Sequence, residues 1–373
     1  MASATTDPAA PSRGNNIGTL RMLGALAVLV GHSFVLSSAD GRTPGGFSQA
    51  ISDVAGFHLG LPGLGLAMFF VISGYLVSAS YVRRGTLLAY VEARLLRIYP
   101  ALWVAIAFMV LVGMVLSPYS PLEYLKSDKT LVYVAGGASL VDMNYLLPGV
   151  FTGNPSDSVN GSLWTLPVEM RMYLFTALVG VLGLLGRRAL FNLVVAAAVA
   201  VGVIWPGSLP LLSDQNHAEI SIFFVAGAVL YVNRDVLPLR AVGLAALVAL
   251  AAALSWTDAY PLAFALAFSY AVLLLGFTKR VRLPDLAARG DFSYGTYLYA
   301  FFVTQLWVSA LGPGHGWPVL ALTLVTTLPL AVASWRLVEE PALRLKGRIV
   351  PSQTDQPVSY SPHRPAPRRE GFR

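Results

Sequence analysis

The feature that most constrains this chain is a series of apolar runs, most of them close to 20 residues long, that recurs along nearly its whole length. A helix needs about 20 apolar residues to cross the hydrocarbon core of a bilayer, where every backbone polar group must be paired internally. We therefore predict an all-α fold, a polytopic membrane helix bundle of about ten transmembrane helices. The runs are 17–38, 62–82, 98–117, 164–185, 189–205, 218–232, 240–256, 260–278, 292–311 and 317–337.

The composition agrees with a membrane protein. Hydrophobic residues make up 55% of the 373 residues and charged residues only 12%, whereas soluble domains carry about 25% charged residues. The absence of cysteine excludes disulfides, Cys-metal sites and thiol catalysis. The net charge is +7, but the basic residues lie in short clusters between apolar runs, which is typical of membrane topology and not of a nucleic-acid partner.

The basic residues also predict an orientation. Of the 26 Lys and Arg residues, 22 lie on one side: in the two termini, in alternate connections, or, like Arg21, in a run near its end on that side. Only Arg42, Lys126 and Lys129 lie in the opposite connections, and Arg171 lies inside the fourth run. Because Lys and Arg favour the cytoplasmic side, we predict both termini in the cytoplasm of a multi-pass cell-membrane protein. The expected parts are a cytoplasmic tail (1–16), a membrane domain (17–347) and a disordered cytoplasmic tail (348–373).

The longest predicted outside connection, 118–163, contains an apolar stretch broken by Gly136, Gly137, Asp142 and Pro148. These residues interrupt the pattern of a spanning helix, so we expect an interfacial or re-entrant piece there.

Two polar residues interrupt the first run. Arg21 and His32 are eleven positions apart, about three helical turns, and therefore share one helix face. A charged side chain in hydrocarbon costs roughly 2.5–3.5 kcal/mol, which favours a functional reason for its presence. A neutral imidazole can act as a general base toward a hydroxyl. The alternatives are that His32 packs against a neighbouring helix and that Arg21 extends to the headgroups.

Further polar residues mark the third and fourth runs. Arg94 and Arg97 are three positions apart at the entry to the third run, a spacing that suits phosphate recognition but also fits a purely topological role. Glu169 and Tyr173 share a face at the start of the fourth run and are expected at the depth of His32. Alternatively, Glu169 has only a structural role and forms an ion pair with Arg171 or another arginine. No metal site is expected, since no second ligand lies at a suitable spacing from His32.

Several segments together resemble the integral-membrane acyltransferase 3 family, which includes O-acetylases of surface polysaccharides. The first run has the Arg-x10-His pattern, and Ser73 lies in a stretch similar to the Phe-Phe-x-x-Ser-Gly motif of the second span. Trp164, Glu169 and Tyr173 match the Trp-x4-Glu-x3-Tyr segment. The other matching segments are "RLLRIYPALW", "DFSYGTYLYAFFVTQ" and "SWRLVEEPALRLK", so the resemblance extends over residues 17–347.

The resemblance implies transfer of an acyl group, commonly acetyl, from cytoplasmic acyl-CoA to a hydroxyl of a carbohydrate or glycosylated acceptor outside. Acyl-CoA would be a co-substrate, with no permanently bound cofactor. On this basis His32 and Glu169 are candidate catalytic residues. Arg21, Arg94 and Arg97 are candidate acyl-CoA-binding residues. Ser73, Trp164 and Tyr173 are expected to contact the substrate or to stabilise the site. One departure is Ala300, where many members carry a histidine, so His32 would act alone or with a carboxylate.

Two other functions are compatible with intramembrane polar residues. In a secondary transporter, Arg21, His32 and Glu169 would form an ion relay, although the chain has no visible inverted repeat. An acyl-lipid flippase would use the same helix bundle to move a lipid across the membrane without catalysing a reaction.

Overall fold

The computed structural model describes residues 15–38, 47–57, 60–205, 208, 214–348 and 350, which contain helices and no strand. The helices are α1 (Ile17–Ser37), α2 (Phe47–Ala55), α3 (Gly60–Arg84), α4 (Leu87–Leu116), α5 (Pro121–Lys126), α6 (Asp128–Ser139), α7 (Thr165–Val181), α8 (Arg188–Ile204), α9 (Gln215–Val232), α10 (Ala241–Ala253), α11 (Tyr260–Phe277), α12 (Ser293–Leu311), α13 (Gly316–Ser334) and α14 (Glu340–Leu343). A 3-10 turn (Gly161–Trp164) precedes α7, a second (Leu184–Gly186) follows it, and a π turn (Trp335–Glu339) joins α13 to α14.

The predicted all-α class is confirmed, and each of the ten predicted runs contains a helix. Within the described residues, five helical stretches are long and apolar enough to cross a membrane: α1, α3, α4, α11 and the stretch from α13 through α14. The count of ten spans stays a prediction. Of the predicted tails, only residues 15, 16, 348 and 350 belong to the described chain, so the expected disorder of the rest lies outside it.

One predicted boundary was wrong. The third membrane run was placed at 98–117, but α4 begins at Leu87 and continues through Pro100 to Leu116. Thr86 caps its start by accepting a hydrogen bond from the Ala89 amide, which satisfies one of the donors left free at a helix N-terminus. Arg94 and Arg97 therefore project from the second and third turns of one long helix and not from a loop before it.

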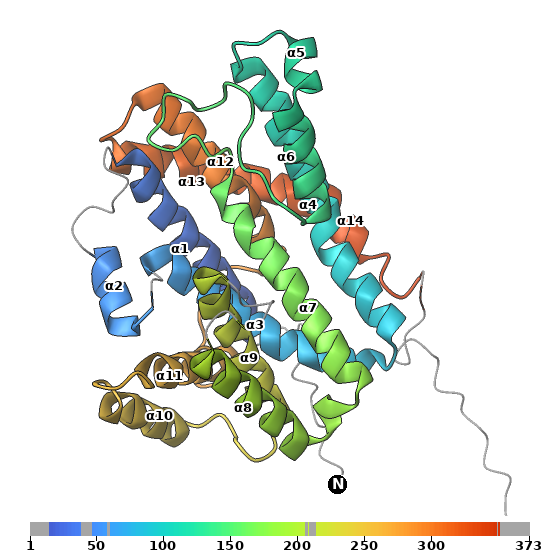
Figure 1. Ribbon diagram of the computed structural model, residues 1–373, viewed down its shortest axis with the longest axis vertical. Coiled ribbons are helices and arrows are strands. Elements are labelled where there is room, and N and C mark those ends of the chain that lie inside the picture. The colour runs from blue at the N-terminus through green and yellow to red at the C-terminus, as the bar shows by residue number, and fades with distance from the viewer. Residues whose placement is uncertain are drawn as a thin grey trace, which may run out of the picture.

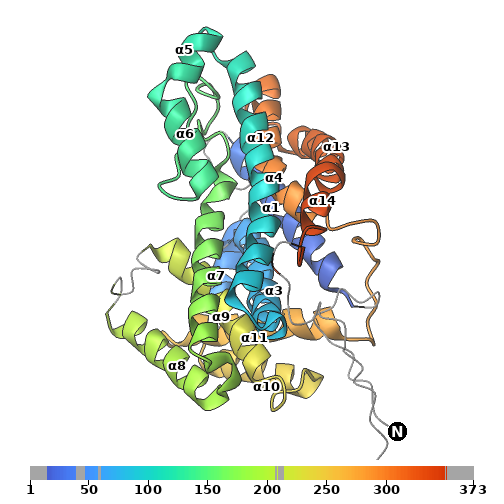
Figure 2. The ribbon, with the colours of Figure 1, turned by 90° about the vertical axis from the view of Figure 1, so that its right-hand side faces the viewer.

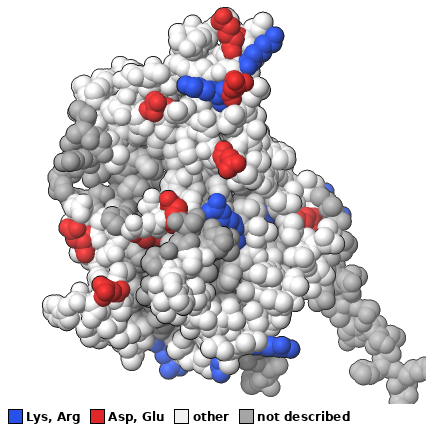
Figure 3. Space-filling view, in the orientation of Figure 1, with Lys and Arg blue, Asp and Glu red and all other residues white. Residues whose placement is uncertain are grey.

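The helices form an elongated bundle (Figures 1 and 2). Helix α3 packs against α1 and α9, while α12 packs against α1 and α13. Helices α8 to α11 gather at one end of the molecule, and α5 and α6 lie at the other. Charged side chains are sparse on the face shown in Figure 3, most of which is uncharged. This surface suits contact with lipid.

Hydrogen bonds and an ion pair join the ends of α1, α11 and α12 at two faces of the molecule. At one face, the Asn16 amide before α1 donates to the carbonyl of Gly276 near the end of α11 (2.8 Å), and Arg21 of α1 pairs with Asp291 just before α12. At the opposite face, the Gly314 amide after α12 donates to the carbonyl of Ser37 at the end of α1 (2.6 Å). Which face meets the cytoplasm stays a prediction.

Segment 118–163 contains a short helix that turns back along α4. Helix α6 has 12 residues, about 18 Å in length, and so is too short to cross a bilayer core of about 30 Å. Near its end, the carbonyl of Ala138 accepts a hydrogen bond from the Trp103 indole of α4 (3.1 Å). The arrangement agrees with the expectation of a piece that does not form an additional span.

Two glycines bring α3 and α9 into close contact. A Cβ at Gly74 would lie 2.0 Å from the Phe224 carbonyl oxygen, and one at Gly227 would lie 2.2 Å from that of Val71. Both obstacles are backbone atoms of the facing helix, which a side-chain rotation cannot move. Small residues of this kind allow membrane helices to approach each other closely.

We expect Gly74→Val to destabilise the bundle by forcing α3 and α9 apart. Overpacking costs about 1–3 kcal/mol in soluble cores, so a clearly lower thermal midpoint of the purified protein in detergent is the expected result. Gly186→Val is the control, because a Cβ at Gly186 meets nothing within 4 Å. Equal midpoints for the two variants would contradict this account of the α3–α9 contact.

Candidate active site

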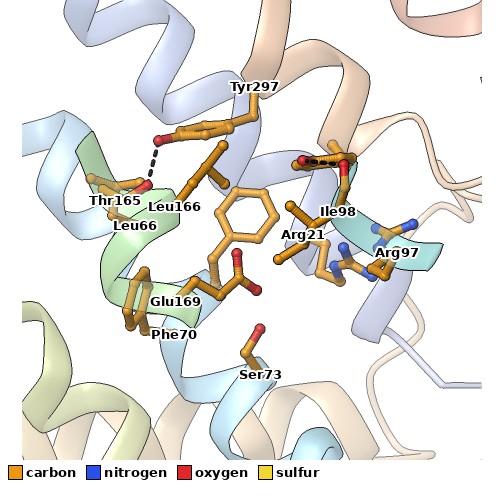
Figure 4. Close-up of a pocket in the computed structure, with 12 residues that line it drawn as sticks. Arg21, Leu66, Phe70, Ser73, Arg97, Ile98, Thr165, Leu166, Glu169 and Tyr297 are labelled. Carbon is orange, nitrogen blue, oxygen red and sulfur yellow. Dashed lines mark hydrogen bonds between the residues drawn. The ribbon is translucent and has the colours of Figure 1, made fainter. Parts of the chain in front are cut away.

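A small pocket lies in the middle of the bundle, where five helices meet (Figure 4). Its volume is about 50 Å³, enough for a thin chain or a few water-sized groups and too small for a nucleotide. Four of the predicted site residues line it: Arg21 from α1, Ser73 from α3, Arg97 from α4 and Glu169 from α7. The remaining lining residues are Leu66, Phe69, Phe70, Ile98, Thr165, Leu166, Tyr294 and Tyr297.

One carboxylate joins two of the arginines. The Asp291 Oδ2 atom accepts from Arg21 Nη1 at 2.6 Å and from Arg97 Nη2 at 2.8 Å, while its Oδ1 atom accepts from the Ser293 hydroxyl at 2.5 Å. The side chains of Arg21 and Arg97 are 23% and 13% exposed. Because a guanidinium has five N–H donors, each arginine keeps donors for another group after binding Asp291.

The chain before α12 brings Asp291 to this position. The Asn16 amide group donates to the carbonyls of Leu275 and Val281 (2.7 and 2.8 Å), and the Thr19 hydroxyl donates to the carbonyl of Pro284 (2.8 Å). These bonds satisfy the backbone polar groups of an irregular connection and tie it to the first turn of α1. Asp291, at the end of this connection, is thereby held against Arg21, which lies about one turn further along α1 than Asn16.

The electrostatics of the arginine pair depend on two carboxylates. Burial alone would raise the pKa of Asp291, but the neighbouring Arg21 and Arg97 guanidinium groups hold it well below its usual range. Asp291 is therefore an anion between two cations. Glu339, 2% exposed, lies 3.7 Å from Arg97 and accepts a hydrogen bond from the Ser334 hydroxyl at 3.0 Å. Sequence reasoning overlooked both acids, although each lies in a segment that matches the family.

Glu169 and Tyr173 interact as their spacing predicts. The Tyr173 hydroxyl donates to Glu169 Oε1, and the Glu169 carboxylate and Ser73 hydroxyl extend toward each other in the pocket (Figure 4). Within the described chain Glu169 forms no ion pair with Arg171, which instead lies 3.4 Å from the His217 ring. The Trp164 ring stacks on His217 and does not line the pocket.

The expectation that Glu169 lies beside His32 was wrong. Glu169 shares its pocket with Arg21 and Arg97, and His32 is not among the lining residues. The reason is that the 3-10 turn before α7 already lies near the level of His32: a Cβ at Gly161 would be 3.0 Å from Phe301, the ring that His32 contacts. Glu169 follows further along α7, at the pocket that Arg21 lines.

His32 lies farther along the same pair of helices. It is about 16 Å from Arg21 along α1, and its ring packs edge-on against Phe301 of α12, with 5.1 Å between centroids. Phe301 follows Tyr297, a pocket residue, by one helical turn. No described residue forms a hydrogen bond with the His32 ring, and Ala300, the next residue before Phe301, is buried at 1% exposure.

A second group of cations lies nearer the start of α4. The Arg94 guanidinium covers the Tyr173 ring, 5.5 Å from its centroid, and its buried Nε atom has no hydrogen-bond partner. Burial and the neighbouring charges of Arg94 and Arg97 lower the pKa of Lys346, just after α14, to about 7. Lys346 was not singled out from the sequence, because only the packing of α14 against α4 places it here.

Comparison with known proteins gives a consistent identity. A family model described as an acyltransferase domain matches residues 15–336. The chain is 30% identical to an O-acetyl transferase of Shigella phage Sf6, over 88% of this chain and 96% of that protein. It is 29% identical to Nodulation protein 10 of Rhizobium leguminosarum bv. viciae, over 90% and 95% of the two chains. No solved structure matches. The chain belongs to the acyltransferase 3 family and is a multi-pass membrane acyltransferase.

Proposed function

We propose that this enzyme transfers an acetyl group from cytoplasmic acetyl-CoA to a hydroxyl of a carbohydrate or glycosylated acceptor outside the cell membrane. The observation that carries the proposal is the pocket at Arg21 and Arg97, with a basic cluster on one side of it and His32 about 16 Å beyond it along α1. The O-acetyl transferase among the relatives supports acetyl as the transferred group.

In this proposal the cations hold the phosphates of CoA. Arginine binds phosphate through paired donors, and Arg21 and Arg97 each keep donors that Asp291 does not use. Arg94 and Lys346 extend the positive charge toward the start of α4. Because the pocket is narrow, the nucleotide stays outside it and the thin pantetheine arm enters, carrying the thioester toward His32.

His32 would then act as the general base. Its ring nitrogen takes the proton of the acceptor hydroxyl while the hydroxyl oxygen attacks the thioester carbonyl, and the CoA thiolate leaves. The free ring nitrogens of His32 support this role. Glu169 stays a candidate catalytic residue at the pocket, where its carboxylate lies along the path proposed for the thioester.

The proposal is tested by CoA release from acetyl-CoA. The purified protein in nanodiscs is incubated with acetyl-CoA, with and without cell-envelope glycans, and free CoA is measured with a thiol reagent. A chain without cysteine contributes no background to this assay. We expect release that rises when glycans are added, with acetyl ester on the glycan detected by mass. If neither CoA release nor acetyl ester formation is detected, the proposed reaction is refuted.

We expect the affinity for CoA to fall as the pH rises through 7. Phosphate favours the ammonium form of Lys346, whose pKa of about 7 means that the charge is present below pH 7 and lost above it. One charge-assisted bond of about 1.5–3 kcal/mol corresponds to roughly tenfold or more in affinity. Calorimetric titration with CoA from pH 6 to 8.5 measures the change. Lys346→Arg should keep high affinity throughout, and a Lys346→Gln variant with the parent's pH profile would contradict the role of Lys346.

Sidedness is tested with single cysteines in the cysteine-free chain. Gly153 and Gly186 are suitable sites because a Cβ at either meets nothing within 4 Å, and they lie on opposite predicted sides. An impermeant maleimide should label Gly153→Cys in intact spheroplasts and Gly186→Cys only after lysis, as the distribution of basic residues predicts. The reverse pattern would overturn the two-sided reaction.

A further inference from the structure

A second, open concavity lies between α6 and the chain that follows it, and it shares no residue with the pocket at Arg21. Its volume is about 600 Å³, and it belongs to the segment predicted to face outward. It is lined by apolar and polar side chains: Val132, Met143 and Leu146, with Asp142, Asn144, Tyr145 and Ser158.

The polar groups of this concavity are free to bind a ligand. Within the described chain, the Asp142 carboxylate and the Tyr145 hydroxyl form no hydrogen bond, and the buried Ser158 hydroxyl has no partner. Asn144 Oδ1 accepts from the Leu146 amide at 2.8 Å, which leaves its NH₂ group available. Asp142 is exposed and Asn144 and Tyr145 are half-buried, so these groups can reach a ligand from outside. A buried hydroxyl is normally paired, so the unpaired Ser158 hydroxyl beside them favours a polar ligand.

The backbone beneath these groups is held in one conformation. Leu140 and Asp142 have φ angles of 60° and 46°, values that are uncommon outside glycine and that cost about 1–3 kcal/mol each. The Val159 amide donates to the carbonyl of Tyr145 at 2.7 Å, and the Gln305 amide group donates to that of Ser158 at 2.6 Å. The hollow is therefore fixed to α12 before any ligand arrives.

A short stretch of chain connects the concavity to Phe301, the ring that His32 contacts. Ser158 lines it, and three residues later Gly161 lies so close to Phe301 that a Cβ would be 3.0 Å from that ring. Phe301 also contacts the His32 ring. Three residues of chain extend at most about 10 Å, so Ser158 lies within about one nanometre of Gly161, and the Phe301 ring separates Gly161 from His32.

We propose that this concavity docks a neutral saccharide unit of the acceptor. The Asp142 carboxylate accepts from two neighbouring sugar hydroxyls, Asn144 donates to a third, and Val132 and Met143 cover the C–H face of the ring. The negative charge of Asp142 disfavours an acidic sugar. The proposal rests on the proposed function, because that function supplies the carbohydrate acceptor, and it adds where the acceptor binds and of which class it is.

Glycan binding tests the site without the donor. The full chain in nanodiscs, with a fluorophore on Gly186→Cys, is applied to an array of neutral and uronic-acid oligosaccharides. The parent should bind neutral glycans, and Asp142→Asn and Tyr145→Phe should each lower that signal about tenfold or more. Asp128→Asn, the same charge change on the exposed first turn of α6, should bind like the parent.

The outcomes separate the docking site from the proposed function. CoA release from acetyl-CoA in water should be equal in the parent and in all three variants, since the hollow shares no residue with the pocket at Arg21. Unchanged glycan binding in Asp142→Asn and Tyr145→Phe, or a parent that binds no glycan or only uronic acids, would overturn the docking proposal. A parent that binds neutral glycans but never releases CoA would overturn the donor chemistry and leave the docking site supported.

Discussion

Replacement of His32 by alanine is expected to lower acyl transfer by about 10²–10⁴-fold, the usual effect of removing a positioned general base. His32 lies against Phe301 without a hydrogen-bond partner among the described residues, so its loss leaves no buried donor or acceptor unpaired. The variant should therefore accumulate in the membrane like the parent. It should also bind CoA with unchanged affinity, because His32 is about 16 Å from Arg21 along α1.

The measurement is the rate of acetyl ester formation at equal protein level, together with calorimetric titration with CoA. His315→Ala is the control, because His315 is an exposed histidine at the start of α13 and should have no effect on the rate. A His32→Ala enzyme that retains at least a third of the parental rate would show that another group takes the proton. If His32→Ala loses both CoA binding and acyl transfer, the whole bundle has been disrupted.

Replacement of Asp291 by alanine is expected to cost both stability and donor binding. The carboxylate is the shared partner of Arg21 and Arg97, and all three side chains are less than a quarter exposed. Removing one member of a buried ionic group costs on the order of 3–5 kcal/mol, because the remaining charges lose their partner. The two guanidinium groups would then repel each other, and we expect CoA affinity and transfer to fall at least tenfold.

The thermal midpoint in detergent and the dissociation constant of CoA measure these effects. Glu340→Gln is the matched control: it removes one carboxylate from an exposed pair with Arg344, 2.7 Å apart and four residues along the same helix, which is worth a few tenths of a kcal/mol. Asp291→Asn keeps an acceptor oxygen without the charge, so its thermal midpoint and CoA affinity should lie between those of Asp291→Ala and Glu340→Gln. If Asp291→Ala and Glu340→Gln have the same thermal midpoint and the same dissociation constant for CoA, Asp291 does not position the arginines.

The sequence by itself determined the class of fold and part of the site. Apolar runs of membrane length identify helices because hydrocarbon leaves no other way to pair the backbone, and the regular spacing along a helix correctly joined Tyr173 to Glu169. The resemblance of six segments to one family led to the identity that comparison confirmed. These inferences depend on local spacing or on composition, which a linear chain displays directly.

Only the tertiary structure decided which polar groups meet. Arg21 and Asp291 are 270 residues apart, and their contact depends on bonds from Asn16 and Thr19 that hold the connection before α12. Helical periodicity carries no information about such a contact, because it acts within one helix. The depth of Glu169 was misjudged for a related reason: the 3-10 turn before α7 occupies the level of His32, and the length of an apolar run does not show how deep in the bundle the helix begins.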